Sequence, residues 1–367
     1  MSLLGDIRAT SSYYHCAACH TSQQPWDSTL GLGEHRVTRA AEEAISLAGL
    51  LTSFGRAAEV TLQKLTGIRV SESTVRRITE DAGEEAAEAH AAKEAFGPDQ
   101  PWEWQHDAQG KTCGYVSLDH VSVPQQGPGG AQAEGRMAAV ALVYDPQSQH
   151  DEKQPRDCDH VRYLAGLYDL DALGSQLRHQ AAQVGWDALA QQLAISDAGN
   201  GLEDFARVNF PLATRMLDFY HASEHVSKLA RAVHPGNETS AETLTKSWCH
   251  TLKHEGGAVL RRTFEQLDVL NWSAERLEVH RVELGYFRNH EHKMDYPRYF
   301  ACGWQIGSGP VESACKGLIT LRMKGPGMRW GPRGTHTVAH LRSLLLSEST
   351  QWDAFWHRHP RNRHLQN

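Results

Sequence analysis

The sequence predicts an α/β protein in which a mixed β-sheet is flanked by helices. Two stretches, 112–123 and 136–146, alternate apolar with polar residues or are rich in β-branched residues, as is typical of paired strands. Further apolar runs then alternate with helical patterns, which favours a mixed sheet covered by helices. Almost all of 222–300 has apolar residues at helical spacing, and this pattern predicts an all-helical insertion.

A helical region precedes the sheet over residues 34–95. Apolar residues recur at helical spacing in RAAEVTLQKLTG and in VSESTVRRITEDAGEEAAEA, and a short turn at Gly67 joins the two patterns. Ser71 is a favourable N-cap for the second helix. Two helices joined by a tight turn are typical of a helix-turn-helix, which would present Arg76 and Arg77 to DNA. The alternative is a plain helical hairpin that packs on a neighbouring element.

The elements between the two predicted strands and the C-terminus follow in order. A long helical pattern covers 160–185, and the apolar run QLAIS then ends at Asp197. The segment TRMLDFYH predicts a further strand, which would carry Asp218 and His221. After the helical insertion, a stretch rich in turn formers leads into a final helix that begins near Pro310.

The composition is that of an ordinary globular protein and excludes a membrane protein. Hydrophobic residues make up 40% and charged residues 22% of the chain. No apolar run approaches the roughly 18 residues that a membrane-spanning helix requires. Residues 1–10 lack the apolar core of a signal peptide, so the sequence predicts a cytoplasmic protein without a membrane partner.

The charge is distributed unevenly along the chain. The net charge is -7, yet residues 286–367 contain 12 Lys and Arg against 5 Asp and Glu. A nucleic acid would therefore be bound locally, by the C-terminal segment and by a few arginines elsewhere. The seven cysteines are odd in number and scattered, which favours reduced thiols over a disulfide framework.

Three acidic residues occupy positions that a solvated surface charge does not explain. Asp119 lies within an otherwise apolar strand, Asp197 at the end of another, and Glu312 in the first turn of a helix introduced by GSGP. Ligands of open α/β sheets bind at strand ends, so these carboxylates are expected to converge there. Such a cluster needs a metal to neutralise it, and two Mg²⁺ or Mn²⁺ ions about 3.5 to 4 Å apart would catalyse phosphodiester chemistry.

Three segments resemble a known family. The strand Asp in YVSLDH, the stretch ISDAGNGLEDFARVNFPLATRMLDFYHASEH and the stretch GSGPVESACKGLITLRMKGPGMRW resemble the DDE transposases of the ISKra-type insertion-sequence group, relatives of the Mutator-like enzymes. The resemblance extends over nearly the whole chain, from YYHCAAC to the C-terminal helix. It implies an RNase H-like fold whose catalytic, metal-binding triad is Asp119, Asp197 and Glu312.

A second mark of this family is an Asp or Cys, then two residues, then His, which matches Asp218 and His221. We expect these two residues to orient a scissile phosphate or a flanking strand. The alternative for His221 alone is a hydrogen-bonded core histidine. The chain departs from the family at His120 and Ala198, where glycine commonly follows each catalytic aspartate, and a bulkier residue there could narrow the approach of DNA.

Basic residues and one tryptophan follow the predicted catalytic glutamate. Lys and Arg can neutralise phosphates, Gly and Pro can hold a loop open, and Trp offers a stacking surface for a base. The alternative is a solvated basic helix end. Together with Arg76 and Arg77, the predicted DNA-binding residues are Lys316, Arg322, Lys324, Arg329, Trp330 and Arg333.

The segment HCAACH admits three interpretations. The spacing of Cys16, Cys19 and His20 matches c-type haem attachment, which requires an export signal that residues 1–10 lack. Alternatively, Cys16 and Cys19 are half of a zinc ribbon. The third interpretation is a local site completed by His15 and His20. The resemblance implies a ribbon whose first ligand pair lies upstream, so we expect a shortened N-terminus and only a partial zinc site.

The motifs and the resemblance divide the chain into five segments. These are 1–33, a partial zinc-ribbon-like segment; 34–95, the helix-turn-helix region; 96–221, the first part of the RNase H-like core; 222–300, the helical insertion; and 301–367, the final helix of the core with the basic C-terminal segment.

The sequence thus predicts a transposase that cuts and joins double-stranded DNA at element ends and target sites. We expect it to associate with the nucleoid and to form a homo-oligomer when assembled on DNA. Two alternatives remain open: an RNase H-like nuclease that cuts without joining, and a domesticated, catalytically inactive DNA-binding regulator.

Overall fold

The fold is described from a computed structural model of the chain. It describes residues 1–3, 10, 12–23, 37–97, 100–146, 160–197, 199 and 201–358. Within these residues, no helix combines the length and the apolar character that crossing a bilayer would require.

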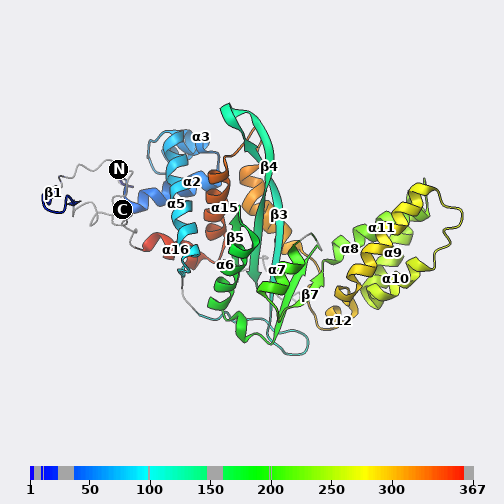
Figure 1. Cartoon of the computed structure of the whole chain (residues 1–367). Coiled ribbons are helices and arrows are strands. Elements are labelled where there is room, and N and C mark those ends of the chain that lie inside the picture. Colours follow the sequence, from blue (N-terminus) through cyan, green and yellow to red (C-terminus); the bar gives the residue numbers. More distant parts are fainter. Residues whose placement is uncertain are drawn as a thin grey trace.

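The main sheet is mixed, as the sequence predicts. Its five strands have the order β5-β4-β3-β6-β7 in the described part of the chain (Figure 1). The central strand β3 pairs antiparallel with β4 and parallel with β6, while β5 pairs antiparallel with β4 and β7 parallel with β6. The strands are β3 (Cys113–Gln126), β4 (Gln132–Tyr144), β5 (Val161–Gly166), β6 (Gln191–Ser196) and β7 (Thr214–Leu217).

The structure differs from the prediction in two places, the β3–β4 hairpin and residues 160–185. The β3–β4 hairpin is longer, because pairing continues to Gln126 and Gln132 after a register shift beyond Val123, which confines the turn to 127–131. The range 160–185 is also not one helix. It begins with strand β5. The spacing of the apolar residues there fits a helix or a strand, and pairing with β4 makes the segment a strand.

The sheet is covered on both faces, which separates two apolar cores. Side chains alternate along β3, so Tyr115 belongs to one core and Val116 to the other. The second core is closed by α6 (Leu170–Gln183), η3 (Trp186–Ala188) and α7 (Leu202–Asn209). Asp119 shares the odd-numbered face of β3 with Tyr115, so it points towards the core that the C-terminal helices cover.

The N-terminal helical region packs against a C-terminal helix. Helix α5 contacts both α2 and α15, and Gly83 permits this close approach because a β-carbon there would overlap the Thr337 carbonyl. Ser71 caps α5 by accepting a hydrogen bond from the Thr74 amide, as predicted. The elements are α2 (Arg39–Leu51), α3 (Phe54–Arg56), the π-helical η1 (Ala57–Thr61), α4 (Leu62–Leu65), α5 (Glu72–Ala91) and α15 (Pro332–Leu346).

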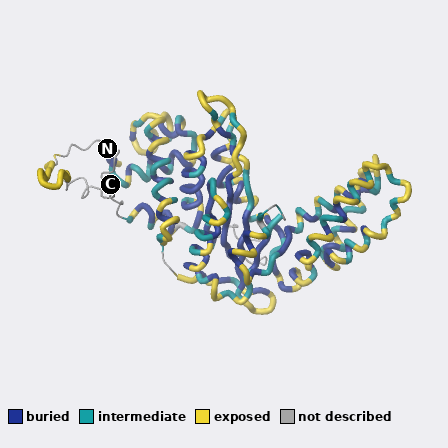
Figure 2. Tube along the Cα trace, viewed as in Figure 1, coloured by how far each residue is buried: buried dark blue, intermediate teal, exposed yellow. Residues whose placement is uncertain are grey.

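Helices after β7 form an arm that extends away from the sheet (Figure 1). Figure 2 shows many exposed residues towards the far end of this arm and at the tip of the β3–β4 hairpin, whereas buried residues concentrate in the sheet. We call these elements the helical arm. They are α8 (Phe219–Val233), α9 (Glu238–Glu255), α10 (Gly257–Glu265), α11 (Ala274–His290), η4 (Glu291–Lys293) and α12 (Tyr296–Ala301).

The chain then returns to the sheet through a helical segment that contains a π-helical turn. This segment consists of α13 (Gly309–Ala314), η5 (Cys315–Thr320) and α14 (Leu321–Met323), and the last helix of the described chain is α16 (Ser349–His357). Both α13 and η5 contact β3. A π-turn next to a glutamate is informative, because such turns occur frequently at functional sites.

Candidate active site

The two predicted catalytic aspartates lie at the same end of neighbouring central strands. Ser117 of β3 pairs with Ile195 of β6 in the last register position of this parallel ladder. Two residues further in the same register, Asp119 comes opposite Asp197, which directly follows β6. Neighbouring strands are about 4.8 Å apart. Both aspartates are half-buried, so their side chains border on solvent at this end of the sheet.

The third carboxylate comes from the helical segment that packs on β3. Glu312 lies in the first turn of α13 and is exposed. One turn later, the buried Cys315 thiol donates a hydrogen bond to Asp119 Oδ2 across 3.5 Å. Burial, Asp119 and Glu312 together raise the pKa of this thiol, as expected when two carboxylates lie nearby. Cys315 therefore marks the point where the helix brings Glu312 towards Asp119.

Asp218 has a positioning role that differs from the predicted one. It does not lie on a strand, because β7 ends at Leu217 and the Asp218 side chain caps α8 by accepting from the amides of Tyr220 and His221. Its side chain also accepts from the Ser308 amide at 3.1 Å and from the Ser308 hydroxyl at 2.8 Å. Asp218 is only 3% exposed, and these contacts occupy both of its oxygens.

Ser308 connects this buried cap to the predicted catalytic glutamate. Its hydroxyl oxygen lies 2.8 Å from Glu312 Oε1 as well as 2.8 Å from Asp218 Oδ2. A hydroxyl has one proton and can donate to one carboxylate at a time. Ser308 can therefore donate either to Asp218 or to Glu312. The pattern that the sequence assigned to a strand thus forms a helix cap that supports Glu312.

His221 lies on the first turn of α8 and is half-buried. Its Nδ1 is 4.0 Å from Glu224, an ion pair only when the imidazole is protonated. Its ring packs edge-on against His225 and Tyr286 of the helical arm. Of the two departures from the family pattern, His120 is half-buried in β3, and Ala198 lies outside the described residues.

The carboxylates offer oxygen donors suited to Mg²⁺ or Mn²⁺. Asp119 Oδ1 accepts from the His120 amide at 2.6 Å, and Asp197 Oδ1 accepts from the Gly199 amide at 2.8 Å. Among the residues that the structure describes, none of the three carboxylates is paired with Lys, Arg or His. Uncompensated carboxylates at one edge are the donor set that hard divalent cations prefer.

The carboxylates do not form a closed metal cage. Within the described ranges, no three His, Cys, Asp or Glu side chains are arranged to hold one ion together. Asp119 and Glu312 both lie near Cys315, and the β3–β6 register brings Asp197 beside Asp119. To bind one ion together, the three side chains would have to come closer to one another. Among these described residues, no third ligand completes a zinc site with Cys16 and Cys19.

The cysteine pair lies on an exposed hairpin formed by β1 (Tyr14–His15) and β2 (Ser22–Gln23). Both thiols are exposed and free. Hydrogen bonds from Thr21 lower the pKa of Cys19 to about 7, so a substantial fraction of this thiol is ionised at neutral pH.

Six of the eight predicted DNA-binding residues are exposed in the structure. Arg76 and Arg77 lie on the outer face of α5, and Lys316 lies one turn after Glu312. Lys324 and Arg329 lie in the loop after α14, where the Arg329 guanidinium donates to the Gly130 carbonyl of the hairpin turn at 3.1 Å.

Two of the eight, Arg322 and Trp330, are buried, which contradicts their assignment to a DNA surface. Arg322 is buried, donates to the Gly49 carbonyl at 2.8 Å, and has a pKa lowered to about 10 by burial. Trp330 is 7% exposed and packs over the Arg322 guanidinium. The sixth exposed residue, Arg333, forms ion pairs with three carboxylates of α5, Glu80, Asp81 and Glu84.

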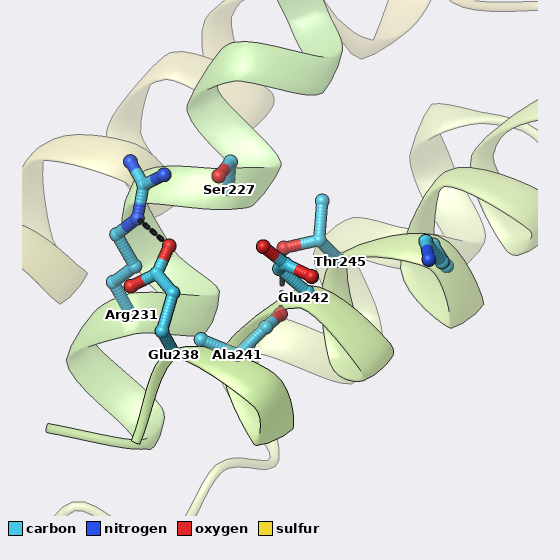
Figure 3. A pocket seen from close by; sticks show the side chains of 7 residues that line it. Ser227, Arg231, Glu238, Ala241, Glu242 and Thr245 are labelled. Atoms are coloured by element: carbon cyan, nitrogen blue, oxygen red, sulfur yellow. Dashed lines mark hydrogen bonds and ion pairs between the residues drawn. The ribbon is translucent and has the colours of Figure 1, made fainter. Parts of the chain in front are cut away.

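A shallow hollow on the helical arm is separate from this carboxylate edge. It lies between α8 and α9 and is lined by small and charged side chains, among them Ser227, Glu242 and Thr245 (Figure 3). Arg231 donates to Glu238 across 3.2 Å at its rim. Arg231 and Glu238 thus pair with each other rather than facing the hollow as free charges.

Sequence reasoning missed the residues that connect the arm and the late helix to the aspartates. Ser308 and Cys315 each contact a predicted catalytic residue, and Tyr286 packs on His221. Ser308 stands within GSGP, and Cys315 stands one turn after Glu312, so both could have been found by projecting the predicted helix. Tyr286 had no such signal, since its position depends on how α11 packs on α8.

Comparison with known proteins adds no family to this geometry. No protein-family model matches the chain, and no curated protein matches it. The resemblance to the ISKra-type transposases therefore rests on the motifs in the sequence and stays a prediction.

Proposed function

We propose that this protein is a DNA transposase with an RNase H-like core, which hydrolyses a phosphodiester at element ends and joins the freed 3′-OH to target DNA. The observation that carries the proposal is the register of the parallel strands β3 and β6, which, continued by two residues, brings Asp119 opposite Asp197, with Glu312 on a helix packed against β3. The mixed strand order supports the fold assignment, since its three antiparallel strands precede the two parallel ones in the chain.

Three carboxylates would hold the catalytic ions. Bound as a pair, Mg²⁺ or Mn²⁺ would activate the attacking water or 3′-OH and stabilise the leaving oxygen. The chain contributes the placement: the β3–β6 register sets the two aspartates side by side, and Ser308 and the Asp218 cap position the start of α13. Phosphoryl transfer needs positioning and charge neutralisation more than a covalent nucleophile, and this site offers those two properties.

Exposed cations support DNA as the substrate. Lys316 follows Glu312 by one helical turn, so it can pair with a phosphate close to the reacting one. Arg76 and Arg77 lie on α5, the second helix of the helix-turn-helix that the sequence predicts, and face solvent. The chain as a whole is acidic, with a net charge of -7, so DNA contacts must be confined to such local groups.

The decisive experiment compares cutting and joining on DNA. A supercoiled plasmid that carries the DNA flanking the coding sequence is incubated with the full-length protein and Mg²⁺ or Mn²⁺, and a second plasmid serves as target. We expect metal-dependent nicking and covalent joining to the target, both absent from the Asp119→Asn variant.

The two other functions give different results in the same assay. Nicking without a joined product would indicate a nuclease on the same scaffold. Binding to the flanking DNA without any metal-dependent nicking would indicate a DNA-binding regulator, and it would refute the proposed chemistry.

A further inference from the structure

An exposed aromatic ring stands beside the carboxylate edge. Tyr220, the second residue of α8, is 66% exposed. The Asp218 amide, two residues earlier, donates to the Ser196 carbonyl at 2.9 Å, so α8 starts next to the residue that precedes Asp197. Tyr220 therefore lies at the end of the sheet where the predicted catalytic aspartates are found.

The Tyr220 ring lies against the glycine that precedes Ser308. A β-carbon at Gly307 would come within 2.7 Å of Tyr220 Cε2 and 3.0 Å of Cδ2, which is closer than such atoms can approach. Gly307 does not have a positive φ, so its backbone conformation does not require glycine. The missing side chain instead leaves room for one edge of the Tyr220 ring.

One hydrogen-bonded unit holds both the ring and Glu312. Asp218 Oδ1 accepts from the Tyr220 amide and from the Ser308 amide, each at 3.1 Å. The Ser308 hydroxyl oxygen lies 2.8 Å from Glu312 Oε1. The Phe219 ring packs edge-on against the Tyr220 ring, with centroids 5.9 Å apart. Tyr220 is thus fixed relative to Glu312, although most of its surface faces solvent.

We infer that Tyr220 is a stacking surface for one base of the DNA strand that flanks the scissile phosphate. This inference rests on the proposed function, because a phosphate that reacts at the carboxylates brings its neighbouring nucleotides to this edge. Aromatic side chains stack on bases of any sequence. A neutral ring can contact a base beside carboxylates, which repel the phosphates until a cation binds.

The test first maps the nick that the wild type makes in the flanking DNA with Mg²⁺. Duplexes of that sequence are prepared with a single abasic site at each position near the nick, and their affinity for the full-length protein is measured by filter binding in EDTA. On the intact duplex we expect Tyr220→Leu to bind about 10-fold more weakly than wild type. At one abasic position the two proteins should bind equally, because the base that the ring contacts is gone.

Two further variants test whether the aromatic ring at this position is what matters. Tyr220→Phe keeps the ring and removes the hydroxyl, so it should behave as wild type on every duplex. Phe300→Leu is the matched control: it removes an aromatic side chain that is 55% exposed on α12 of the helical arm, and it should leave the affinity unchanged. Tyr220→Leu keeps an apolar side chain against Gly307, so its melting temperature should stay close to that of wild type.

Four results would each overturn the inference and leave the proposed function intact. They are wild-type affinity of Tyr220→Leu for the intact duplex, an equal deficit of Tyr220→Leu at every abasic position, equal weakening by Tyr220→Phe or Phe300→Leu, and a markedly lower melting temperature of Tyr220→Leu. Failure of the wild type to nick the flanking DNA would instead refute the proposed function and the inference with it.

Discussion

At the scale of single residues, Glu312 has two kinds of neighbour. Ser308 holds one of its oxygens, and Cys315 connects its helix to Asp119. Neither neighbour is cationic, so neither neutralises the negative charge of Glu312. That charge can attract a cation, and without one it repels Asp119. A substitution that keeps the shape of Glu312 and removes its charge therefore tests whether the charge is needed for catalysis, without removing the packing of the side chain.

We predict that Glu312→Gln lowers nicking and joining together by orders of magnitude, because both steps use the same phosphoryl-transfer centre. DNA affinity in EDTA should be unchanged or slightly higher, since the substitution removes a negative charge near the phosphate. Filter binding in EDTA and plasmid nicking in Mg²⁺ measure the two effects. Glu238→Gln, on the arm, is a control that should leave both unchanged. Full nicking by the Glu312→Gln variant would remove this residue from the site.

Individual residues also show where sequence reasoning succeeds and where it fails. The strand positions of Asp119 and Asp197 followed from short apolar runs, which are local signals. The burial of Arg322 could not be predicted, because it depends on the Gly49 carbonyl and the Trp330 ring, both brought in by tertiary packing. Asp218 was placed on a strand because DFYH continues an apolar run, but its side-chain cap starts a helix there.

At the scale of elements, α5 has two faces with different roles. One face packs on α2 and α15, and it explains why this helix is stable. The other exposes Arg76 and Arg77. Element type was predicted well for α5 and for the helical arm, whose apolar periodicity is sustained over several turns. It was predicted poorly for β5. Six residues are too few to distinguish the helical repeat of apolar residues from the strand repeat unless the neighbouring strand is known.

We predict that Arg76→Ala and Arg77→Ala each weaken binding to the flanking DNA and reduce the salt dependence of binding. Each lost phosphate contact should lower the slope of log K against log salt by about 0.9. Affinity is measured over a series of salt concentrations, and Mn²⁺ affinity should be unaffected. Arg281→Ala, an equally exposed arginine on α11, serves as the control. Unchanged DNA affinity in both α5 variants would show that the hairpin is purely structural.

At the scale of the whole molecule, a buried polar chain joins the N-terminal helical region to the sheet. Tyr168, after β5, contacts His340 of α15, and His340 Nε2 lies 2.9 Å from His90 Nδ1 of α5. Burial lowers the pKa of both histidines, that of His90 from 6.5 to about 3. The folded protein therefore keeps two neutral imidazoles in a place where the unfolded chain would take up protons.

We predict that acid weakens this junction. Between pH 6.5 and about 3 the unfolded chain binds a proton at His90 and the folded chain does not. The free energy of unfolding should therefore fall as pH decreases from 6.5, by about 1.4 kcal/mol per pH unit for one such histidine. Urea unfolding at a series of pH values measures the slope. His90→Leu should flatten it, whereas the exposed His106→Leu should not, and equal slopes for wild type and His90→Leu would contradict the prediction.

The position of Glu312 late in the chain has a consequence for the newly made protein. All five strands of the main sheet are synthesised before the helical arm, and both aspartates are synthesised with them. One face of the newly made sheet stays uncovered until α13, η5 and α15 have been synthesised. The apolar residues of this face can therefore be bound by chaperones while the arm is translated. The helix that finally covers this face also delivers the last carboxylate. On the proposed function, a chain that stalls within the arm is consequently harmless to the genome, because translation itself withholds the nuclease until the fold is complete.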